Sequence, residues 1–478
     1  MAKEGFFKRL RSRFPAGGKY EEVRLREPYP LGTVRVRVPW EGVPICVNLG
    51  PEGPKLHIYP ETPLDDSTDS RPQGFVLLDP KCCHLGINGF LRLARRGDSL
   101  VLGHQDKQQM AMFNYPDSVD MRHLEITHDG DGLIFRKLVS DARVQLSPVA
   151  EENAVERNAD RRWERLGVIR AIYGGRLEPL SPREALQTLE AVNEILGTEA
   201  YRTPDDRGRP GGVVRIPNGL TPIIVGDLHA QVDNLLTLLT QNGFLEALET
   251  AEAALIILGD AVHSEVEGQM DEMESSLLMM DLILRLKLRF PRQVFYIRGN
   301  HDSFSQNEFK FGVAQCLVWE STLRSRRGMG YLREMERFYD GLPYLVLSDG
   351  YVACHAAPIK TKFNLDRLVN IHRHPGLVQE LTHNRLRRRT SPAGYTAHDV
   401  KHFRETMNLP ENTPFFVSHS PLNREDPLWL NAGGIKNHHI VFSANLPWIG
   451  VFTRIRGQMV PLSYHREDLV PAVNALAS

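Results

Sequence analysis

Three short stretches between Ile223 and Asp302 each combine an apolar run, a glycine and a polar cluster. They read IIVGDLHA, LIILGDAVH and FYIRGNHD. Two further apolar runs, YVAC and FFVS, lead into histidines. Together these segments offer two carboxylates, an amide oxygen and several imidazoles: Asp227, His229, Asp260, Asn300, His301, His355 and His419. Such a set can hold two metal ions, which clamp a phosphoryl group and activate water at neutral pH.

The order of these motifs carries more weight than any one of them. An isolated Gly-Asp pair or a histidine after a strand is usually a turn or a satisfied polar residue. Five such motifs in one chain, each following an apolar run, rarely coincide. Asp227 and His229 alternate along one segment and therefore point the same way. Mixed carboxylate and imidazole ligands suit Mn best here, with Fe or Zn as alternatives, over Ca or Mg.

The apolar runs read as buried strands of a parallel sheet, because they are short, rich in β-branched residues and ended by glycine. Helical patterns lie between them, over Val232–Leu248 and Met273–Arg289. Alternating strands and helices predict βαβ units. The polar clusters then share the carboxyl edge of the sheet, where open α/β sheets bind ligands. We expect an α/β fold with a two-sheet core flanked by helices.

These motifs resemble those of the calcineurin-like metallophosphoesterases, and within them the phosphoprotein phosphatase family. The family pattern GDxHG, GDxVDRG, GNHE, HGG, a later lone histidine and FSAPNY corresponds here to GDLHA, GDAVHSE, GNHD, HAA, SHS and FSANLP. The segment AGYTAHDVKHF, Ala393–Phe403, resembles the family's helix before the last histidine ligand. The resemblance covers roughly Pro217 to Leu462.

The resemblance implies a role for each matching residue. The first metal ion would be held by Asp227, His229 and Asp260, and the second by Asp260, Asn300, His355 and His419. His301 would be the general acid that protonates the leaving oxygen. Arg298 would grip the phosphate, together with one of the arginines just before the family's last helix, for which the candidates are Arg387, Arg388 and Arg389.

Two departures from the family pattern concern the substrate more than the metal ions. His263 stands where the family has an aspartate that orients the catalytic histidine, and Ser264 stands where it has a phosphate-binding arginine. A carboxylate beside an imidazole raises the pKa of that imidazole and fixes its tautomer. Without it, we expect His263 to be an exposed histidine that itself donates a proton or binds substrate.

The whole chain has 478 residues, too many for one ordinary domain. We expect a β-rich N-terminal domain over residues 1–146, a helical linker over 147–212 and a metallophosphoesterase domain over 213–478. Ser181 to Glu184 form a capping box at the start of a helix in that linker. The net charge of −1 gives no general attraction to nucleic acid. No segment is long enough to span a bilayer, and the sparse cysteines suit a reducing cytoplasm.

The N-terminal part reads as closely spaced strands with Gly, Pro and Asp turns, which predicts a small β-sandwich. The HDGDG segment, His128–Gly132, is a predicted hairpin turn. The stretches SLVLGH and RHLEITHDGDGLIFRKL resemble a forkhead-associated domain, a phosphothreonine-binding β-sandwich. His104, Asp120 and Met121 stand at three phosphate-gripping positions of that family, while His123 is retained. The first 14 residues would form either an amphipathic helix or a frayed terminus.

We therefore expect a phosphoesterase that hydrolyses phosphomonoesters through a water activated by two metal ions. The favoured substrate is phosphoserine or phosphothreonine on protein, and a protein partner would bind through the N-terminal domain. One alternative is hydrolysis of a dinucleoside polyphosphate or another nucleotide. Another is a regulatory phospho-binding module with a weak catalytic site. Because every chemical motif follows Gly212, the N-terminal domain should not be needed for hydrolysis of a small ester.

Overall fold

The structure, a computed structural model, describes residues 20–61, 64, 72–149, 154–266, 268–306, 308–310, 312–444 and 447–476. The predicted N-terminal amphipathic helix and two residues of the FSANLP motif lie outside these ranges. The described residues form two compact units. One contains residues 20–164 and 454–462, and the other contains residues 165–453 and 463–476. The chain passes from the first unit to the second within helix α2 (Ala154–Tyr173).

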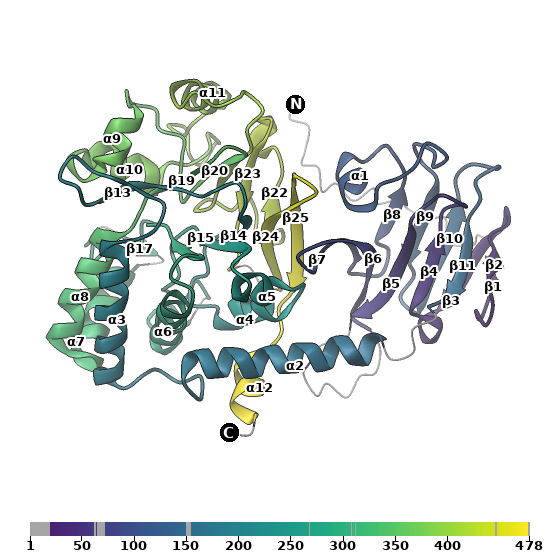
Figure 1. The fold of residues 1–478 in the computed structure, drawn as a ribbon, viewed down its shortest axis with the longest axis horizontal. Coiled ribbons are helices and arrows are strands. Elements are labelled where there is room, and N and C mark those ends of the chain that lie inside the picture. The colour runs from purple at the N-terminus through teal and green to yellow at the C-terminus, as the bar shows by residue number, and fades with distance from the viewer. Residues whose placement is uncertain are drawn as a thin grey trace. The chain divides into compact units, whose positions relative to one another are not determined.

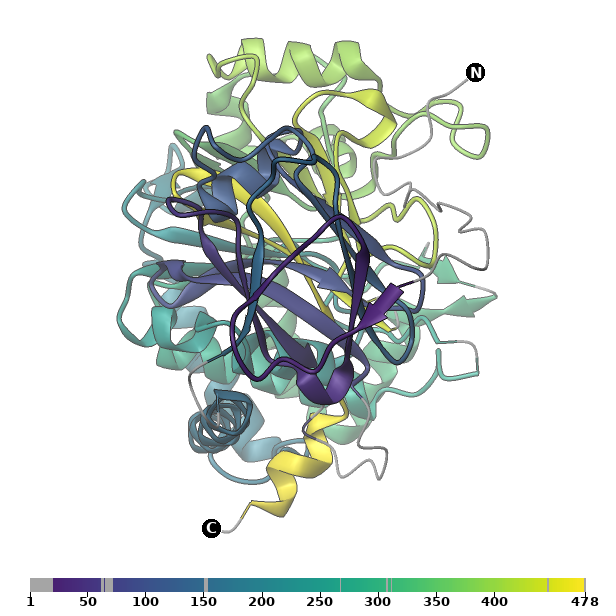
Figure 2. The ribbon, with the colours of Figure 1, turned by 90° about the vertical axis from the view of Figure 1, so that its right-hand side faces the viewer.

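The first unit is built from two sheets, which Figure 2 turns toward the viewer. One sheet has the order β1-β3-β10-β9-β8, with strands Tyr20–Glu22, Arg35–Pro39, Gly132–Lys137, Leu124–His128 and Ser99–Leu102. The other has the order β2-β11-β4-β5-β6-β7, with strands Tyr29–Pro30, Gln145–Pro148, Ile45–Asn48, Lys55–Glu61, Gly74–His84 and Ile87–Leu93. A short 3-10 helix, Trp40–Gly42, and helix α1, Lys107–Phe113, connect strands.

Alternation of apolar residues explains why these segments form a sandwich. Val36 and Val38 of β3 and Ile45 and Val47 of β4 are buried, while the residues between them, Arg37 and Cys46, are less covered. Every second side chain of a strand points to the same face, so each sheet buries one face. The predicted HDGDG turn is confirmed, because His128 of β9 pairs with Leu133 of β10 directly across it. The predicted β-rich N-terminal region is therefore present.

The second unit also contains two sheets (Figure 1). The sheet with the order β16-β15-β14-β24-β25 has strands Val294–Tyr296, Ala253–Ile257, Thr221–Val225, Trp448–Ile455 and Gln458–His465. The sheet with the order β12-β13-β19-β20-β21-β23-β22 has strands Arg202–Pro204, Pro210–Arg215, Leu345–Ser348, Tyr351–Cys354, Phe415–Val417, His438–Val441 and Leu428–Trp429. A small hairpin pairs β17, Phe309–Lys310, with β18, Val313–Ala314. The predicted α/β fold with a two-sheet core is confirmed.

Helices cover these sheets in Figure 1. Their ranges are Pro182–Gly197 (α3), Val232–Thr240 (α4), Phe244–Glu249 (α5), Glu274–Arg289 (α6), Gln315–Arg326 (α7), Gly328–Gly341 (α8), Leu365–Val369 (α9), Pro375–His383 (α10), Ala397–Thr406 (α11) and Leu469–Ala475 (α12). Short 3-10 helices span Ile371–Arg373 and Ala432–Gly434. The capping box at Ser181 and Glu184 is confirmed at the start of α3. Among the helices that the structure describes, none is both long and apolar enough to cross a membrane.

One prediction of local structure is wrong in detail. The helix predicted over Val232–Leu248 is broken into α4 and α5, because Asn242 and Gly243 adopt φ angles of 53° and 70°. Such left-handed angles end a helix, and glycine and asparagine adopt them most readily.

The two sheets of the second unit place their carboxyl ends together. Strands β14, β15 and β16 run parallel to one another, and so do β20 and β21 in the other sheet. The loops that follow β14, β15 and β16 carry Asp227, Asp260 and Asn300, and those that follow β20 and β21 carry His355 and His419. Each sheet thus contributes part of one site. An isolated bridge between Asp227 and Phe442 also ties the first of these loops to the segment after β23.

Candidate metal centre

Glycines before the metal-ligand positions allow the loops to approach one another closely. A Cβ atom on Gly299 would lie 2.1 Å from Oδ1 of Asp260, and one on Gly259 would lie 2.5 Å from the backbone nitrogen of Gly299. Neither distance is compatible with a side chain. The recurrent Gly-Asp and Gly-Asn pairs of the sequence therefore have a packing reason, which is to bring the loops after β15 and β16 into contact.

Several residues without glycine's freedom adopt left-handed backbone angles at the same place. The φ angles are 41° for His229, 61° for Ala230, 49° for Asp260, 70° for His263 and 61° for His419. Each such residue costs on the order of 1–3 kcal/mol and persists only where the surrounding structure enforces it. Strain of this kind gathers at functional sites, and here it coincides with the predicted ligands.

The predicted metal ligands fall into two overlapping groups of buried side chains. Asp227, His229 and Asp260 each offer one ligand atom within 4.8 Å of the others, and Asp260, His355 and His419 do the same. Asp260 is common to both groups. The sixth predicted ligand, Asn300, joins the second group, because its Oδ1 atom lies 3.1 Å from Nε2 of His355. The structure thus brings all six predicted ligands together.

The hydrogen-bond pattern around His355 calls for a cation. Its Nδ1 atom lies 2.7 Å from the carbonyl oxygen of Leu258, which can only accept, so Nδ1 carries the proton. The lone pair of Nε2 then faces Oδ1 of Asn300 at 3.1 Å and Oδ2 of Asp260 at 3.3 Å. Facing acceptors of this kind favour a positive charge between them, from a metal ion or from a proton on Asp260, whose pKa is raised. Histidines that bind a metal ion usually donate the N–H of their other ring nitrogen to a carbonyl or carboxylate in this way.

His229 and His419 resemble His355 in that Nδ1 of each has a partner within the protein. Nδ1 of His229 lies 3.1 Å from the carbonyl oxygen of His263, which leaves Nε2 free to face Oδ2 of Asp227 at 3.7 Å. Nδ1 of His419 lies 3.1 Å from Nε2 of His355, and its own Nε2 is buried without a hydrogen-bond partner among the described residues. The residues present therefore fit a pair of divalent ions.

The carboxylates of this cluster have strongly perturbed acidities. Burial raises the pKa of Asp260 well above its ordinary value, and the charges of Asp227 and Asp302 raise it further. Burial also acts to raise the pKa of Asp227, but His355, His229 and a hydrogen bond from Ser418 together hold it below its ordinary value. Accumulated negative charge in a buried place favours either a proton or a metal ion on Asp260.

Asp302, the acid of the GNHD motif, holds the loops in register. It is fully buried and accepts hydrogen bonds from the backbone nitrogens of Gly299 at 2.7 Å and Asp260 at 3.2 Å, and from the hydroxyl of Tyr296 at 2.7 Å. Sequence reasoning gave this residue no role. Its position directly after His301 was the only available signal, and its contact with Asp260 joins it to a loop 42 residues away in sequence.

Asn300 is oriented by a pair that the sequence did not reveal. Its Nδ2 atom donates to Glu308 at 3.1 Å, and the other oxygen of Glu308 lies 2.8 Å from Nε2 of His383. The amide nitrogen is thereby occupied, so its oxygen faces His355. The hydrogen bond from His383 lowers the pKa of Glu308. Nothing in the local sequence of either residue marks this function.

Arg385, which was not among the candidates, contacts the backbone of a predicted ligand. Its Nη1 atom lies 3.4 Å from the carbonyl oxygen of His419 and 3.3 Å from Oγ of Ser420. Arg387 donates to the carbonyl of Pro392, Arg388 donates to the carbonyls of Pro421 and Leu422, and Arg389 is exposed. We take Arg385 as a further candidate for binding the substrate phosphate.

Arg298, predicted to grip phosphate, is engaged elsewhere in this structure. Its Nη1 atom donates to the carbonyl of Tyr339 at 2.9 Å and lies 3.3 Å from Oδ1 of Asp340. Both residues belong to the end of α8. Lys310 supplies another positive charge, paired with Glu265, whose Oε1 atom lies 3.2 Å from Nε2 of His229. Burial lowers the pKa of Lys310 to about 8.

The expectation that His263 is exposed is wrong, since its exposed fraction is 0%. Its ring packs against that of Trp319 from α7, with ring centroids 6.2 Å apart, and against that of His301 at 5.2 Å. Burial lowers the pKa of His263 well below its ordinary value, and His301 and His229 lower it further. His263 is therefore a neutral imidazole behind the predicted acid.

His301 itself lies at the edge of the cluster. Its exposed fraction is 8%, and its ring stands edge-on to that of His229 with centroids 5.6 Å apart. Its backbone nitrogen donates to Oδ1 of Asp260 at 2.9 Å. Burial, with the neighbouring His229 adding to it, lowers the pKa of His301 to about 3. A bound phosphate would favour the protonated form.

Comparison with known proteins gives a consistent picture for this part of the chain. A profile of the calcineurin-like phosphoesterase family matches residues 220–445. The serine/threonine-protein phosphatase PP2A-like PPG1 of Candida albicans is 26% identical over 202 residues, which cover 41% of this chain and 42% of that protein. The serine/threonine-protein phosphatase with EF-hands 2 of Mus musculus is 23% identical over 211 residues, which cover 44% of this chain and 25% of that protein.

The matched region is less than half the length of both relatives. Among solved structures, a protein serine/threonine phosphatase from Saccharomyces cerevisiae with similarity to human phosphatase PP5 is 17% identical, with a TM-score of 0.46. That alignment covers 60% of this chain and 90% of the other.

Proposed function

Because residues 220–445 form a calcineurin-like phosphoesterase domain, we propose that this protein is a metal-dependent phosphatase acting on phosphoserine or phosphothreonine in proteins. The observation that carries the proposal is the pair of overlapping ligand groups that share Asp260, with Asn300 joined to the second of them. Both named relatives are serine/threonine-protein phosphatases, which favours a phosphoprotein as the substrate class.

Each of the clustered side chains has a place in this proposal. Asp227, His229 and Asp260 would hold one divalent ion, and Asp260, Asn300, His355 and His419 the other, with Mn²⁺ as the first choice for such ligands. Bound there, the ions would neutralise phosphoryl charge and supply a nucleophile at neutral pH. Asp302 and Glu308 keep the ligand loops and the Asn300 amide in position.

The chain's own residues would handle the substrate and the proton. The guanidinium of Arg385 is free to form charge-assisted hydrogen bonds to a phosphate beside His419. His301, beside the metal ligand His229, would carry the proton on its imidazole and donate it to the departing oxygen. His263 would act behind it as a neutral neighbour that sets the acidity of His301 without itself reaching the substrate.

Replacing His263 by Asp should shift the pH dependence of the reaction. A carboxylate beside His301 favours its protonated form and raises its pKa. Since the reaction needs protonated His301, the falling limb of the kcat/KM profile should move to higher pH. The profile of a soluble phosphopeptide checks this, with His263→Asn as the neutral control of the same size. A limb that stays in place, or moves to lower pH, would refute this relation between the two residues.

Replacing Arg385 by Ala should raise KM for a phosphopeptide by about 10–100-fold, because a hydrogen bond to a charged group contributes on the order of 1.5–3 kcal/mol. Arg389→Ala is the matched control, since that arginine belongs to the same run and is exposed. Steady-state kinetics give the KM of both variants for the same phosphopeptide. A larger increase in KM for Arg389→Ala than for Arg385→Ala would contradict this assignment and favour the arginines first predicted from the sequence as the phosphate ligands.

A side-by-side substrate screen tests the proposed function itself. The purified full chain, loaded with Mn²⁺, is assayed with phosphoserine and phosphothreonine peptides, with dinucleoside polyphosphates and with an aryl phosphate. The proposal requires turnover of the phosphopeptides above that of the nucleotides. Turnover confined to the nucleotides would favour the nucleotide hydrolase, and binding of phosphopeptides without turnover would favour the regulatory module.

A further inference from the structure

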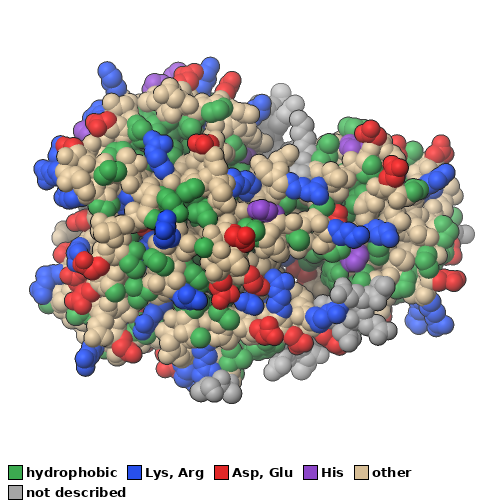
Figure 3. All heavy atoms as spheres, in the orientation of Figure 1, with side chains coloured by type: hydrophobic (Ala, Val, Ile, Leu, Met, Phe, Trp, Pro, Cys, Tyr) green, Lys and Arg blue, Asp and Glu red, His purple; other side chains and the backbone are tan. Residues whose placement is uncertain are grey.

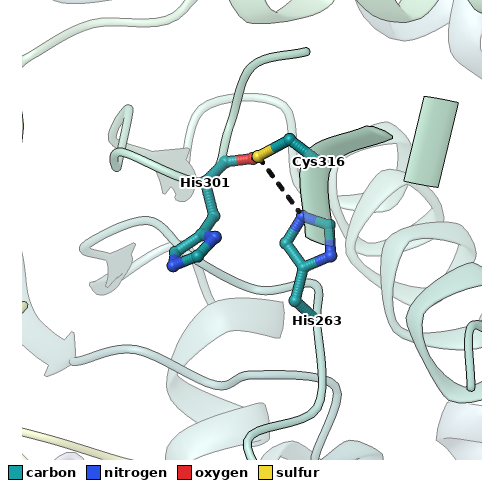
Figure 4. Close-up of side chains that lie close together, drawn as sticks. All are labelled: His263, His301 and Cys316. Atoms are coloured by element: carbon teal, nitrogen blue, oxygen red, sulfur yellow. Dashed lines mark hydrogen bonds between the residues drawn. The ribbon is translucent and has the colours of Figure 1, made fainter. Parts of the chain in front are cut away.

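A third group of potential metal ligands lies beside the proposed two-ion site. His263, His301 and Cys316 are all buried, and each offers one ligand atom within 4.8 Å of the others (Figure 4). They come from the loop after β15, the loop after β16 and the first turn of α7. The two-ion site uses none of these three side chains as a ligand, so this group is available for a separate purpose.

The polar atoms of this group are poorly satisfied by the protein alone. Sγ of Cys316 lies 3.9 Å from Nε2 of His263, the contact dashed in Figure 4, and 3.9 Å from the carbonyl oxygen of His301. The Nδ1 atoms of His263 and His301 are buried without hydrogen-bond partners among the described residues. A buried polar atom left unpaired costs about 1–3 kcal/mol. One sulfur and two imidazole ligands thus converge, and their hydrogen bonds to the protein are weak or missing among the described residues.

The distances suit a tetrahedral ion. With Zn–S of about 2.3 Å and Zn–N of about 2.0–2.1 Å, tetrahedral angles place a sulfur and a nitrogen ligand about 3.6 Å apart. The observed separation between Cys316 and His263 is 3.9 Å, which a small side-chain movement would close. Thiolate and imidazole ligands select Zn²⁺ over the harder ions that prefer oxygen.

A redox role for Cys316 is disfavoured by its surroundings. Burial raises the pKa of its thiol to about 12, so the reactive thiolate is scarce without a metal ion. The residue is fully buried, at 0% exposure, which also restricts access for oxidants. A metal ion would displace the thiol proton on binding, as it does at other cysteine sites.

We propose that His263, His301 and Cys316 form an inhibitory Zn²⁺ site, separate from the two ions of the phosphatase site. Its regulatory consequence rests on the proposed function, because an ion on the imidazole of His301 prevents that imidazole from carrying a proton to the leaving oxygen. The substitution of the family's aspartate by His263 supplies the second imidazole. Zn²⁺ would thus inhibit the protein without displacing the ions that hold the phosphoryl group.

Co²⁺ can replace Zn²⁺ as a spectroscopic probe in the Mn²⁺-loaded full chain. One added equivalent should give a near-ultraviolet thiolate-to-cobalt band in the wild type and none in Cys316→Ser or Cys316→Ala. Equilibrium dialysis should show one more tightly bound Zn²⁺ per chain in the wild type than in either variant. Cys83→Ser, which removes an exposed thiol, should behave as the wild type.

The kinetic arm uses the same proteins. Cys316→Ser should keep the basal turnover and require at least about tenfold more Zn²⁺ for half-inhibition, given that even supporting residues of metal sites change affinity by about 10–100-fold. Equal Zn²⁺ stoichiometry, or equal inhibition, in wild type and Cys316→Ser would overturn the proposal. If no phosphate ester is turned over but the Cys316-dependent band appears, the Zn²⁺ site stands and the proposed phosphatase function fails.

Discussion

Asp260→Asn should lose its metal ions and its phosphatase activity together. Asp260 belongs to both groups of converging ligands, so its loss damages both ion sites at once. Since residues that merely support a metal ligand change affinity by about 10–100-fold, a bridging ligand should cost more than about 100-fold. Elemental analysis after dialysis measures the metal content, and turnover of an aryl phosphate measures activity on the same sample.

The stability of the metal-free protein provides an independent check. The pKa of Asp260 is raised above its ordinary value of 3.8, so ionising it costs stability above that pH, and the cost grows until the raised pKa is reached. Below about pH 4 the cost is absent. Chelated wild type should therefore lose stability relative to chelated Asp260→Asn as pH rises, and added Mn²⁺ should raise the Tm of the wild type only.

Thermal melts of both proteins, with chelator and with Mn²⁺, from about pH 4 to about pH 8 test this expectation. Asp349→Asn, at an acid on the turn between β19 and β20, is a control for the loss of one negative charge elsewhere in the same unit. Full activity of the chelated wild type would contradict the two-ion site, as would a normal Tm response of Asp260→Asn to Mn²⁺.

His301→Ala should slow hydrolysis of phosphoserine peptides by about 10²–10⁴-fold, the usual contribution of a general acid. An alkoxide leaving group needs that proton, whereas a nitrophenolate leaves without one, so an aryl ester should lose far less. The metal content should stay unchanged, because His301 is not among the ligands of the two ions. The ratio of the two losses, measured with matched peptide and aryl substrates, isolates proton donation from other defects.

His402→Ala is the matched control, since His402 is an exposed histidine on α11 of the same unit. It should change neither rate. Equal losses for both esters in His301→Ala would mean that His301 positions the substrate or supports the metal ions. Loss of metal from His301→Ala would point to a defect in the loop after β16, whose backbone contacts Asp260 through His301.

The ligands were predictable because each stands shortly after the end of a strand. Asp227, Asp260 and Asn300 all follow a glycine that ends an apolar run, so local pattern and strand direction together placed them. The face of the molecule in Figure 3 carries Lys and Arg interspersed with Asp and Glu.

The remaining features depend on packing between segments far apart in sequence. His263 is buried because Trp319 and Cys316 of α7 cover it, and nothing near His263 in the sequence announces that helix. Glu308 orients Asn300 through a contact that also involves His383. Arg385 lies beside His419 while its neighbours in the same basic run turn elsewhere. Side-chain directions of this kind follow from tertiary structure alone.

The hairpin of β24 and β25 has a consequence for synthesis of the chain. Its turn and the adjoining strand ends, residues 454–462, belong to the unit formed by residues 20–164, where Arg456 donates to Sγ of Cys82 at 2.7 Å. About 290 residues separate position 164 from position 454, and a ribosome adding about 5–20 residues per second needs on the order of 15–60 seconds for them. The unit formed by residues 20–164 therefore waits for residues that are made much later, and a nascent chain that stalls in between leaves this unit unfinished.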